Sequence, residues 1–113
     1  MTTNDVLMHH LTAFGSNDLE EILKDYTEQS EILTANGPLK GLEAIRGFFV
    51  DFFTAIPTGS AFEMKKLTVT GPVAYIFWTS ESETFEFLMG TDTFFLQDEK
   101  ILYHTVADYR IAR

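Results

Sequence analysis

The spacing of apolar residues changes once along this chain, near Pro57, and this change constrains the fold more than any other feature of the sequence. Before Pro57, apolar residues recur every three or four positions, as they do on one face of an amphipathic helix. From Ala61 onward, the chain is rich in Phe, Thr, Val, Tyr and Ile, in segments that turn residues separate. Helices followed by strands, without alternation of the two, are typical of an α+β domain.

The first half of the chain is expected to form three helices. Their apolar stripes cover residues 6–14, 19–26 and 42–56. Gly15 is expected to end the first helix, since glycine commonly follows a helix end. Asn17 with Glu20 fits an N-cap and its capping-box partner at the start of the second helix. Pro57 stops the third helix, because proline cannot continue one.

The remaining apolar segments are expected to be strands. A short strand falls between residues 28 and 34, before the turn signal Asn36-Gly37-Pro38. Four longer strands are expected over residues 62–70, 73–81, 84–97 and 100–111. Because short turns join the last strands, these should be antiparallel neighbours. The sequence therefore predicts a single domain, residues 1–113, with three N-terminal helices packed on a curved antiparallel sheet.

The composition excludes several classes of function. The net charge is −9 and the eight Lys and Arg residues are scattered, so neither nucleic acid nor a membrane is an expected partner. There is no cysteine, no signal-peptide pattern and no apolar run of the ~20 residues that span a bilayer, so a cytoplasmic protein is expected. The three histidines lack metal-ligand spacing and no glycine-rich loop precedes a helix, so no metal and no cofactor are expected.

Three short segments carry a resemblance to a known family: NDLEEILKDYTEQ, GLEAIRGFF and TDTFFLQDEKI. In this order and spacing, the chain resembles the SnoaL-like and ketosteroid isomerase-like group of the nuclear-transport-factor-2-like superfamily. The resemblance implies a cystatin-like cone, in which a bent sheet and its helices enclose an apolar pocket. Members include isomerases, dehydratases, polyketide cyclases and proteins that only bind, so the fold alone does not decide the function.

The resemblance to the isomerases can be followed position by position. Their proton-shuttling Asp corresponds to Thr34, which cannot act as a general base near neutral pH. Their phenolic oxyanion donor corresponds to His10, and the Tyr that orients this donor corresponds to Tyr26. Their protonated oxyanion-hole Asp corresponds to Asp92, and a pocket-lining Phe corresponds to Phe48. The chain therefore keeps the strand Asp and lacks the base.

Asp92 is a charged residue in a segment of β-forming residues. Leu88, Gly90 and Phe94 share its face of the expected strand. A carboxyl group among such neighbours is desolvated, which raises its pKa and favours the neutral acid. On this interpretation Leu88 lines a pocket and Gly90 leaves room for a ligand. The alternative is an Asp on the convex face of the sheet, hydrogen-bonded to a Thr.

The last expected strand contains a histidine, His104, that shares one face with Asp108. SnoaL-like cyclases have a similar GKI-x-x-H segment with an Asp a few residues further on, and the resemblance gives Asp108 an acid–base role. Glu99 replaces the usual Gly of the turn, and a one-residue shift in register would send both side chains to the other face. If the register holds, His104 and Asp92 both enter the pocket, where His104 can exchange protons near pH 7.

Other histidine and aromatic residues leave alternatives open. His10 should point inward, either as a core histidine bonded to Tyr26 or as a catalytic group. His9 lies about 100° away around the helix and should be exposed. Trp78 faces either the pocket or a dimer partner. The eleven Phe residues form either a thick aromatic core or the wall of a cavity.

The sequence predicts a protein that binds a small hydrophobic, carbonyl-bearing molecule and acts as a cofactor-independent isomerase, dehydratase or cyclase. Asp92 would donate a hydrogen bond to the developing oxyanion and His104 would move the proton, while His10 and Asp108 assist. The residues expected to line the pocket are Phe14, Tyr26, Thr34, Phe48, Trp78, Leu88 and Gly90.

The alternative function is a non-catalytic module of the same fold that binds a ligand or a partner. The missing base at Thr34 favours it. On either interpretation a homodimer through the convex face of the sheet is expected. The segments 73–78 and 85–88 are apolar on both sides, and such strands need a cover on each face.

Overall fold

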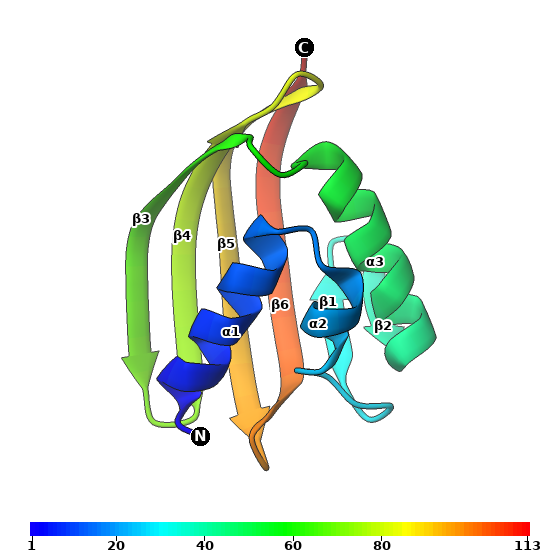
Figure 1. Ribbon diagram of the computed structural model, residues 1–113, viewed down its shortest axis with the longest axis vertical. Coiled ribbons are helices and arrows are strands. Elements are labelled where there is room, and N and C mark those ends of the chain that lie inside the picture. Colours follow the sequence, from blue (N-terminus) through cyan, green and yellow to red (C-terminus); the bar gives the residue numbers. More distant parts are fainter.

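The computed structural model describes residues 1–113 and contains three helices and six strands (Figure 1). The helices are α1 (Thr3–Gly15), α2 (Leu19–Leu23) and α3 (Leu42–Ala55). The strands are β1 (Glu31–Thr34), β2 (Gly37–Lys40), β3 (Ala61–Thr70), β4 (Val73–Glu81), β5 (Phe85–Gln97) and β6 (Lys100–Ala112). The predicted α+β organisation, with the helices before the long strands, is confirmed. None of the helices has both the length and the apolar character needed to cross a membrane.

All six strands belong to one sheet, in the order β2-β1-β6-β5-β4-β3. The expectation of a wholly antiparallel sheet is wrong at one pair: β1 runs parallel to β6, with Ile32 opposite His104. Strand β2 was not predicted, because Gly37 and Pro38 are residues that strands usually avoid. They are accommodated here because β2 is an edge strand, and proline is tolerated at a sheet edge.

The helices lie on one face of the sheet (Figure 1). Helix α1 crosses the long strands, and α3 lies toward the end of the sheet that β1 and β2 form. Each of the pairs β3–β4, β4–β5 and β5–β6 has at least one shift of register. Such bulges bend long strands and increase their twist, which lets the sheet curve around the helices.

The helix ends differ in detail from the sequence predictions. A capping box of Thr2 and Asp5 begins α1, and Gly15 is its last residue. The N-cap of α2 is Asp18, not Asn17 as expected, and its side chain accepts a hydrogen bond from a backbone N–H of the first turn. Asn17 has a positive φ of 50°. Its side-chain oxygen accepts from the backbone of Thr58, so it joins α1 to the loop after α3.

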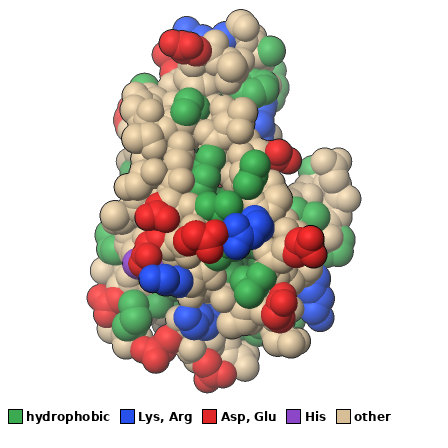
Figure 2. Space-filling view, turned by 45° about the vertical axis from the view of Figure 1, so that its right-hand side comes forward, with side chains coloured by type: hydrophobic (Ala, Val, Ile, Leu, Met, Phe, Trp, Pro, Cys, Tyr) green, Lys and Arg blue, Asp and Glu red, His purple; other side chains and the backbone are tan.

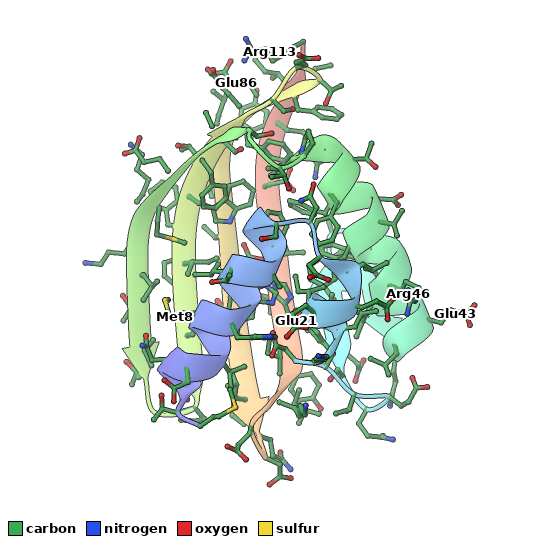
Figure 3. The ribbon with its side chains drawn as sticks, in the orientation of Figure 1. Met8, Glu21, Glu43, Arg46, Glu86 and Arg113 are labelled. Carbon is green, nitrogen blue, oxygen red and sulfur yellow. The ribbon has the colours of Figure 1, made fainter.

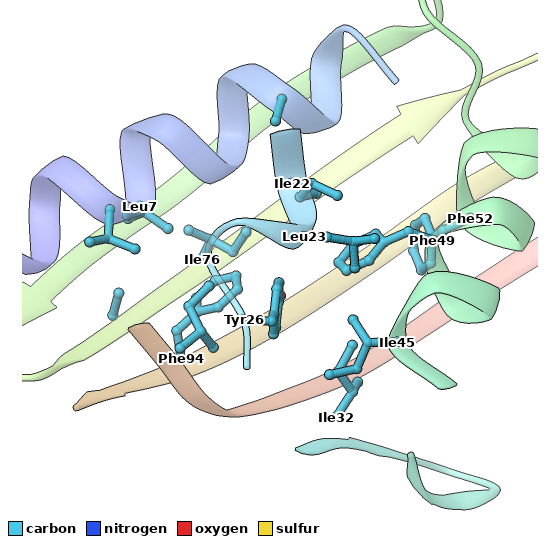
Figure 4. Packing of buried hydrophobic residues seen from close by; sticks show 14 of the residues in the cluster. Leu7, Ile22, Leu23, Tyr26, Ile32, Ile45, Phe49, Phe52, Ile76 and Phe94 are labelled. Atoms are coloured by element: carbon cyan, nitrogen blue, oxygen red, sulfur yellow. The ribbon is translucent and has the colours of Figure 1, made fainter. Parts of the chain in front are cut away.

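The interior between the sheet and the helices is aromatic (Figure 4). Phe49 and Phe52 point from α3 toward the long strands, where Phe52 packs against Phe87. Phe94 of β5 is fully buried beneath α1 and Tyr26. Nineteen buried hydrophobic residues form one continuous cluster. The sequence left open whether the Phe residues form a thick core or the wall of a cavity. In the structure, most of the interior is filled by an aromatic core.

Candidate functional site

A chain of hydrogen bonds joins four side chains in the interior: Tyr26, His104, Asp92 and Trp78. Tyr26 Oη lies 2.9 Å from His104 Nδ1, and His104 Nε2 lies 2.6 Å from Asp92 Oδ2. The second carboxyl oxygen, Asp92 Oδ1, accepts from Trp78 Nε1 at 2.7 Å. His104 is 1% exposed and Asp92 is 8% exposed. These four residues are called the buried relay below.

The register between β5 and β6 brings Asp92 and His104 of the relay together. Phe94 on β5 is directly opposite His104 on β6, so Asp92 lies diagonally across from the imidazole on the same face. The ring of Phe94 stacks on that of His104, with 4.3 Å between centroids. The sequence predicted Tyr26 in the second helix, and this prediction is wrong: α2 ends at Leu23, and Tyr26 comes from the segment after it. The register that the sequence left open thus places Asp92 and His104 together in the interior.

The donors and acceptors of the relay define its protonation pattern. The indole of Trp78 can only donate, so Asp92 Oδ1 is an acceptor. All partners are satisfied when Asp92 is a carboxylate, His104 carries its proton on Nε2 and Tyr26 donates to Nδ1. Burial raises the pKa of Tyr26, and the charges of Asp92 and Asp25 raise it further, so the phenol keeps its proton. In this arrangement the protein itself occupies both oxygens of Asp92.

His10 lies beside the relay without joining it. Its imidazole is 3% exposed and packs edge-on against the rings of Phe94, Tyr26 and His104. Its Nδ1 atom is buried without a hydrogen-bond partner. Burial lowers the pKa of His10 well below its ordinary value, and the nearby His104 and His9 lower it further. His10 is therefore a neutral histidine in contact with Tyr26, with no hydrogen bond between the two.

The cavity beside the relay is small. Its volume is about 30 Å³, and its lining includes Phe14, Phe48, Trp78, His10 and His104. Such a space suits one buried water molecule rather than a substrate. Much of the apolar pocket that the resemblance implied is thus filled by side chains.

The side chain of Trp78 fills part of the space where the apolar pocket was expected. It faces the interior and is 3% exposed. A Cβ atom added to Gly90 would come within 2.2 Å of the indole. The expectation that Gly90 leaves room for a ligand is therefore wrong, because Trp78 already occupies that room.

The expectation for Leu88 is also wrong. Leu88 is 44% exposed and does not line the small cavity beside the relay. A β-bulge between Phe87 and Met89 breaks the alternation of faces along β5. Phe87 takes the interior position that simple alternation from Asp92 assigned to Leu88.

A larger cleft lies between α3, the β1–β2 hairpin and β6. Its volume is about 610 Å³, which is within the range of small-molecule sites. Leu39, Phe48 and Val106 contribute apolar surface, and Thr34 lies at the hairpin. Thr34 donates its hydroxyl to the backbone oxygen of Gly37. Phe48 and Phe52 line both this cleft and the small cavity, so one layer of aromatic rings separates the cleft from the relay.

Asp108 lies in this cleft rather than beside His104. Its carboxylate accepts two hydrogen bonds from Arg110, from Nε and Nη2, each at 2.8 Å. The structure thus separates the four predicted catalytic residues into an interior group of Asp92, His104 and His10, and Asp108 in the cleft. Arg110 was missed in the sequence, although alternation along β6 places it on the face of Asp108.

A second group of ionisable residues, outside the site, was also missed. His9 was expected to be exposed, but its Nε2 lies 2.7 Å from Glu21 and its Nδ1 lies 2.8 Å from Asp25. Hydrogen bonds to Glu21 and Asp25 raise the pKa of His9. Burial raises the pKa of Asp25, and the bond to His9 opposes that effect. No local sequence pattern connects residues so far apart.

Comparison with known proteins agrees with this architecture. The model of the SnoaL-like domain matches residues 7–104. Among curated proteins, none matches the sequence. A putative ketosteroid isomerase from Kribbella flavida is similar in structure, with a TM-score of 0.79 and 12% identity over 98% of this chain and 80% of that protein.

Two further solved structures are similar. A putative polyketide cyclase from Sinorhizobium meliloti has a TM-score of 0.72 and 17% identity over 91% of this chain and 94% of that protein. An epoxide hydrolase/cyclase-like enzyme of pyran ring formation in the polyether salinomycin has a TM-score of 0.79 and 18% identity, over 95% of this chain and 90% of that protein. At these identities the likeness establishes the fold, and the chemistry has to be argued from the residues.

Proposed function

Because the chain belongs to the SnoaL-like domain family of the nuclear-transport-factor-2-like superfamily, we propose that it binds a small hydrophobic molecule with a carbonyl group and transfers a proton on it without a cofactor. The reaction would be of the isomerase, dehydratase or cyclase type. The observation that carries this proposal is the 2.6 Å contact between His104 and Asp92, extended by Tyr26, in an aromatic interior.

Such a relay is costly to bury and suits acid–base chemistry. Carboxylates and imidazoles lose their hydration in an apolar interior. A protein in which apolar residues of similar volume replace such a pair is often as stable as the original, or more stable. Ionisable groups that converge in such a place are candidates for a functional role. A carboxylate on one imidazole nitrogen also fixes the tautomer and supports the positive charge that arises when His104 takes a proton.

The large cleft is the proposed place of the ligand. It adjoins the relay through Phe48, whose ring centroid lies 6.4 Å from that of His104. A ligand in the cleft would reach His104 when the Phe48 side chain rotates away. Asp108, at the wall of the cleft, would act as a second acid–base group. Neutral His10 would orient Tyr26 and His104 by packing.

The second candidate function is binding without catalysis, and a specific observation favours it. Both oxygens of Asp92 and both nitrogens of His104 already have partners within the protein. The cavity beside them holds about 30 Å³. On this interpretation the relay fixes the packing of the interior, and the cleft alone binds the ligand.

Hydrogen–deuterium exchange at carbon distinguishes the two functions. Aromatic ketones with an acidic α-hydrogen are incubated with the protein in D₂O, and loss of the α-proton signal is followed by NMR. Proton transfer predicts exchange above the buffer rate, lowered at least tenfold by Asp92→Asn and by Tyr26→Phe.

The matched control is Tyr103→Phe, which removes a phenol oxygen from an exposed position on the same sheet. It should exchange at the wild-type rate. If the wild type accelerates exchange and all variants match it, catalysis by the relay is excluded. If the wild type accelerates no exchange while ketones still bind, the function of binding without catalysis remains.

We also propose that a second copy of the chain covers the convex face of the sheet. The side chains directed there from the central parts of β4, β5 and β6 carry no charge; they are Tyr75, Phe77, Met89, Thr91, Thr93, Phe95, Tyr103, Thr105 and Tyr109. By contrast, the side of the molecule in Figure 2 mixes acidic, basic and hydrophobic side chains. In a chain of net charge −9, an uncharged face is where two copies approach with the least repulsion.

A further inference from the structure

Arg110 on β6 is a residue of the cleft that neither the sequence nor the family resemblance had indicated. We propose that Arg110 selects the ligand by donating hydrogen bonds to an uncharged acceptor oxygen, such as the carbonyl of a ketone, ester or lactone. This assignment rests on the proposed function, because it concerns the ligand of the same cleft. It adds the group that the ligand must carry and the residue that recognises it.

The guanidinium of Arg110 is held in place before any ligand arrives. Its central carbon lies 4.5 Å from the ring centroid of Phe87, 5.3 Å from that of Phe85 and 5.5 Å from that of Phe52. Contacts of this kind attract a cation to the face of a ring. Two hydrogen bonds to Asp108, from Nε and Nη2, fix the orientation of the guanidinium. A donor fixed in this way loses little freedom on binding.

Part of this guanidinium remains available. Its Nε and Nη2 groups donate to Asp108, whereas Nη1 has no hydrogen-bond partner in the protein. The Arg110 side chain is 34% exposed, and Arg110 is the one cationic residue in the lining of the cleft. Leu39, Phe48 and Val106 give this lining its apolar surface. A hydrophobic molecule would therefore find one fixed donor group above an apolar surface.

The charges in the cleft indicate that the ligand oxygen bound by Arg110 is uncharged. Asp108 neutralises Arg110, and Asp51 adds a further negative charge to the lining. A carboxylate ligand would meet a net charge of −1 and would compete with Asp108 for the same guanidinium. A carbonyl oxygen needs only the free Nη1 group, and it becomes a stronger acceptor as negative charge develops on it during proton removal.

The buried relay offers no such donor. Both oxygens of Asp92 accept bonds from the protein, and the nitrogens of His104 are bonded to Asp92 and Tyr26. In the wall of the cleft, by contrast, the Nη1 group of Arg110 can donate without any protein bond being broken. The geometry therefore assigns recognition of the ligand oxygen to Arg110, not to Asp92.

The test compares three probes of similar shape: 2-acetylnaphthalene, 2-ethylnaphthalene and 2-naphthoate. Binding to the full chain is followed by two-dimensional NMR, with the backbone amides of Gly47 and Ala107 reporting on the cleft. The wild type should bind the ketone about tenfold more tightly than the hydrocarbon, as expected for one hydrogen bond to a charged donor. The carboxylate should bind no more tightly than the ketone.

Arg110→Met should remove the preference for the ketone and leave the affinity for the hydrocarbon within about twofold, because Met keeps apolar contact with the rings. Arg110→Lys, which keeps the charge without the guanidinium, should restore only part of the preference. The matched control is Arg46→Met. Arg46 lies on α3 beside α2 (Figure 3), pairs with Glu20 and is outside the cleft, so this variant should keep the full preference. The two-dimensional spectra also show whether each variant is folded.

Several outcomes would overturn the assignment. Equal affinity of the wild type for ketone and hydrocarbon would do so, as would a preference that persists in both Arg110 variants or a tighter complex with naphthoate. Those results would leave the cleft as a binding site, and so would leave the proposed function standing. Shifts of the Gly47 amide on α3 on simple dilution, without a probe, would show that a second copy occupies the cleft, and would also overturn it. Failure of all three probes to shift the amides of Gly47 and Ala107 would reject both the assignment and the cleft as the ligand site.

Discussion

The indole of Trp78 occupies the space beside Gly90, where a Cβ atom would approach it to 2.2 Å. This contact closes the pocket and lets the indole donate to Asp92. Gly90→Ala should therefore destabilise the protein by about 1–3 kcal/mol through overpacking, although alanine usually suits a strand better than glycine. Chemical denaturation measures the effect.

The control for that variant is Gly47→Ala on α3, where an added Cβ meets nothing within 4 Å. Replacing a glycine inside a helix should stabilise by about 0.5–1 kcal/mol. In a Trp78→Phe background, Gly90→Ala should cost less than in the wild type. An equal cost in both backgrounds would contradict the role given to the indole.

The second prediction concerns the pair of His104 and Asp92. His104→Phe leaves a buried carboxylate with only Trp78 as a partner and should cost about 3–5 kcal/mol of unfolding free energy. Asp92→Leu together with His104→Phe should cost clearly less than the sum of the two single changes, because the double variant leaves neither an uncompensated carboxylate nor an unpaired imidazole. Strict additivity in this double-mutant cycle would show that the 2.6 Å contact carries no coupling.

The third prediction concerns the pH dependence of His9. Bonds to Glu21 and Asp25 raise its pKa, so the folded state binds this proton more tightly than the unfolded state does. The resulting stability is fully present below the unfolded pKa of about 6.5 and is lost as the pH rises through the raised folded value. The stability difference between the wild type and His9→Gln should therefore shrink from pH 6 upward. A difference that grows with pH would refute this sign.

The fourth prediction concerns His10, for which stability changes with pH in the opposite direction from His9. Burial lowers its pKa, so the folded state resists protonation and stability is lost as the pH falls below about 6.5. His10→Phe should be neutral or stabilising at pH 8, because it removes a buried nitrogen that has no partner. Thermal unfolding between pH 8 and 5 should show less acid sensitivity than in the wild type. His9→Gln, measured in parallel, should not share this gain.

The fifth prediction concerns the convex face of the sheet. Tyr103→Glu places a charge at an exposed position of this face and should shift the protein from dimer to monomer in analytical ultracentrifugation. Met8→Glu places the same charge on α1, away from that face, and should leave the mass unchanged (Figure 3). A wild type that sediments as a monomer at micromolar concentration would contradict the proposed dimer.

Much of the fold could be predicted from local patterns. Turn residues bound the long strands closely: β4 has the predicted ends, and the ends of β3, β5 and β6 differ by one residue. Helix α3 was predicted to within one residue, because its apolar face is wide and Pro57 follows it. These features depend on neighbours in sequence, where periodicity and turn chemistry act directly.

The errors arise where distant parts of the chain meet. The bulge between Phe87 and Met89 moves Leu88 to the surface, and no nearby residue in the sequence predicts this bulge. The parallel pairing of β1 with β6 has no local signal either. For the site, alternation brought Asp92 and His104 to one face, but it could not show that Trp78 fills the space at Gly90. It also could not show that His9 meets Asp25 across the turn between α1 and α2.

The pairing of β1 with β6 has a consequence for how the protein folds. The Tyr26–His104 hydrogen bond joins residues 78 positions apart and is made next to the parallel strand pair. Contacts of such high sequence separation form late, because a long loop must close before they are gained. The relay therefore cannot assemble in a partial structure of α1, α2 and β1. The NMR signal of the Tyr26–His104 bond would report the closure of the long loop that brings β1 beside β6, which makes it a natural probe for that step of folding.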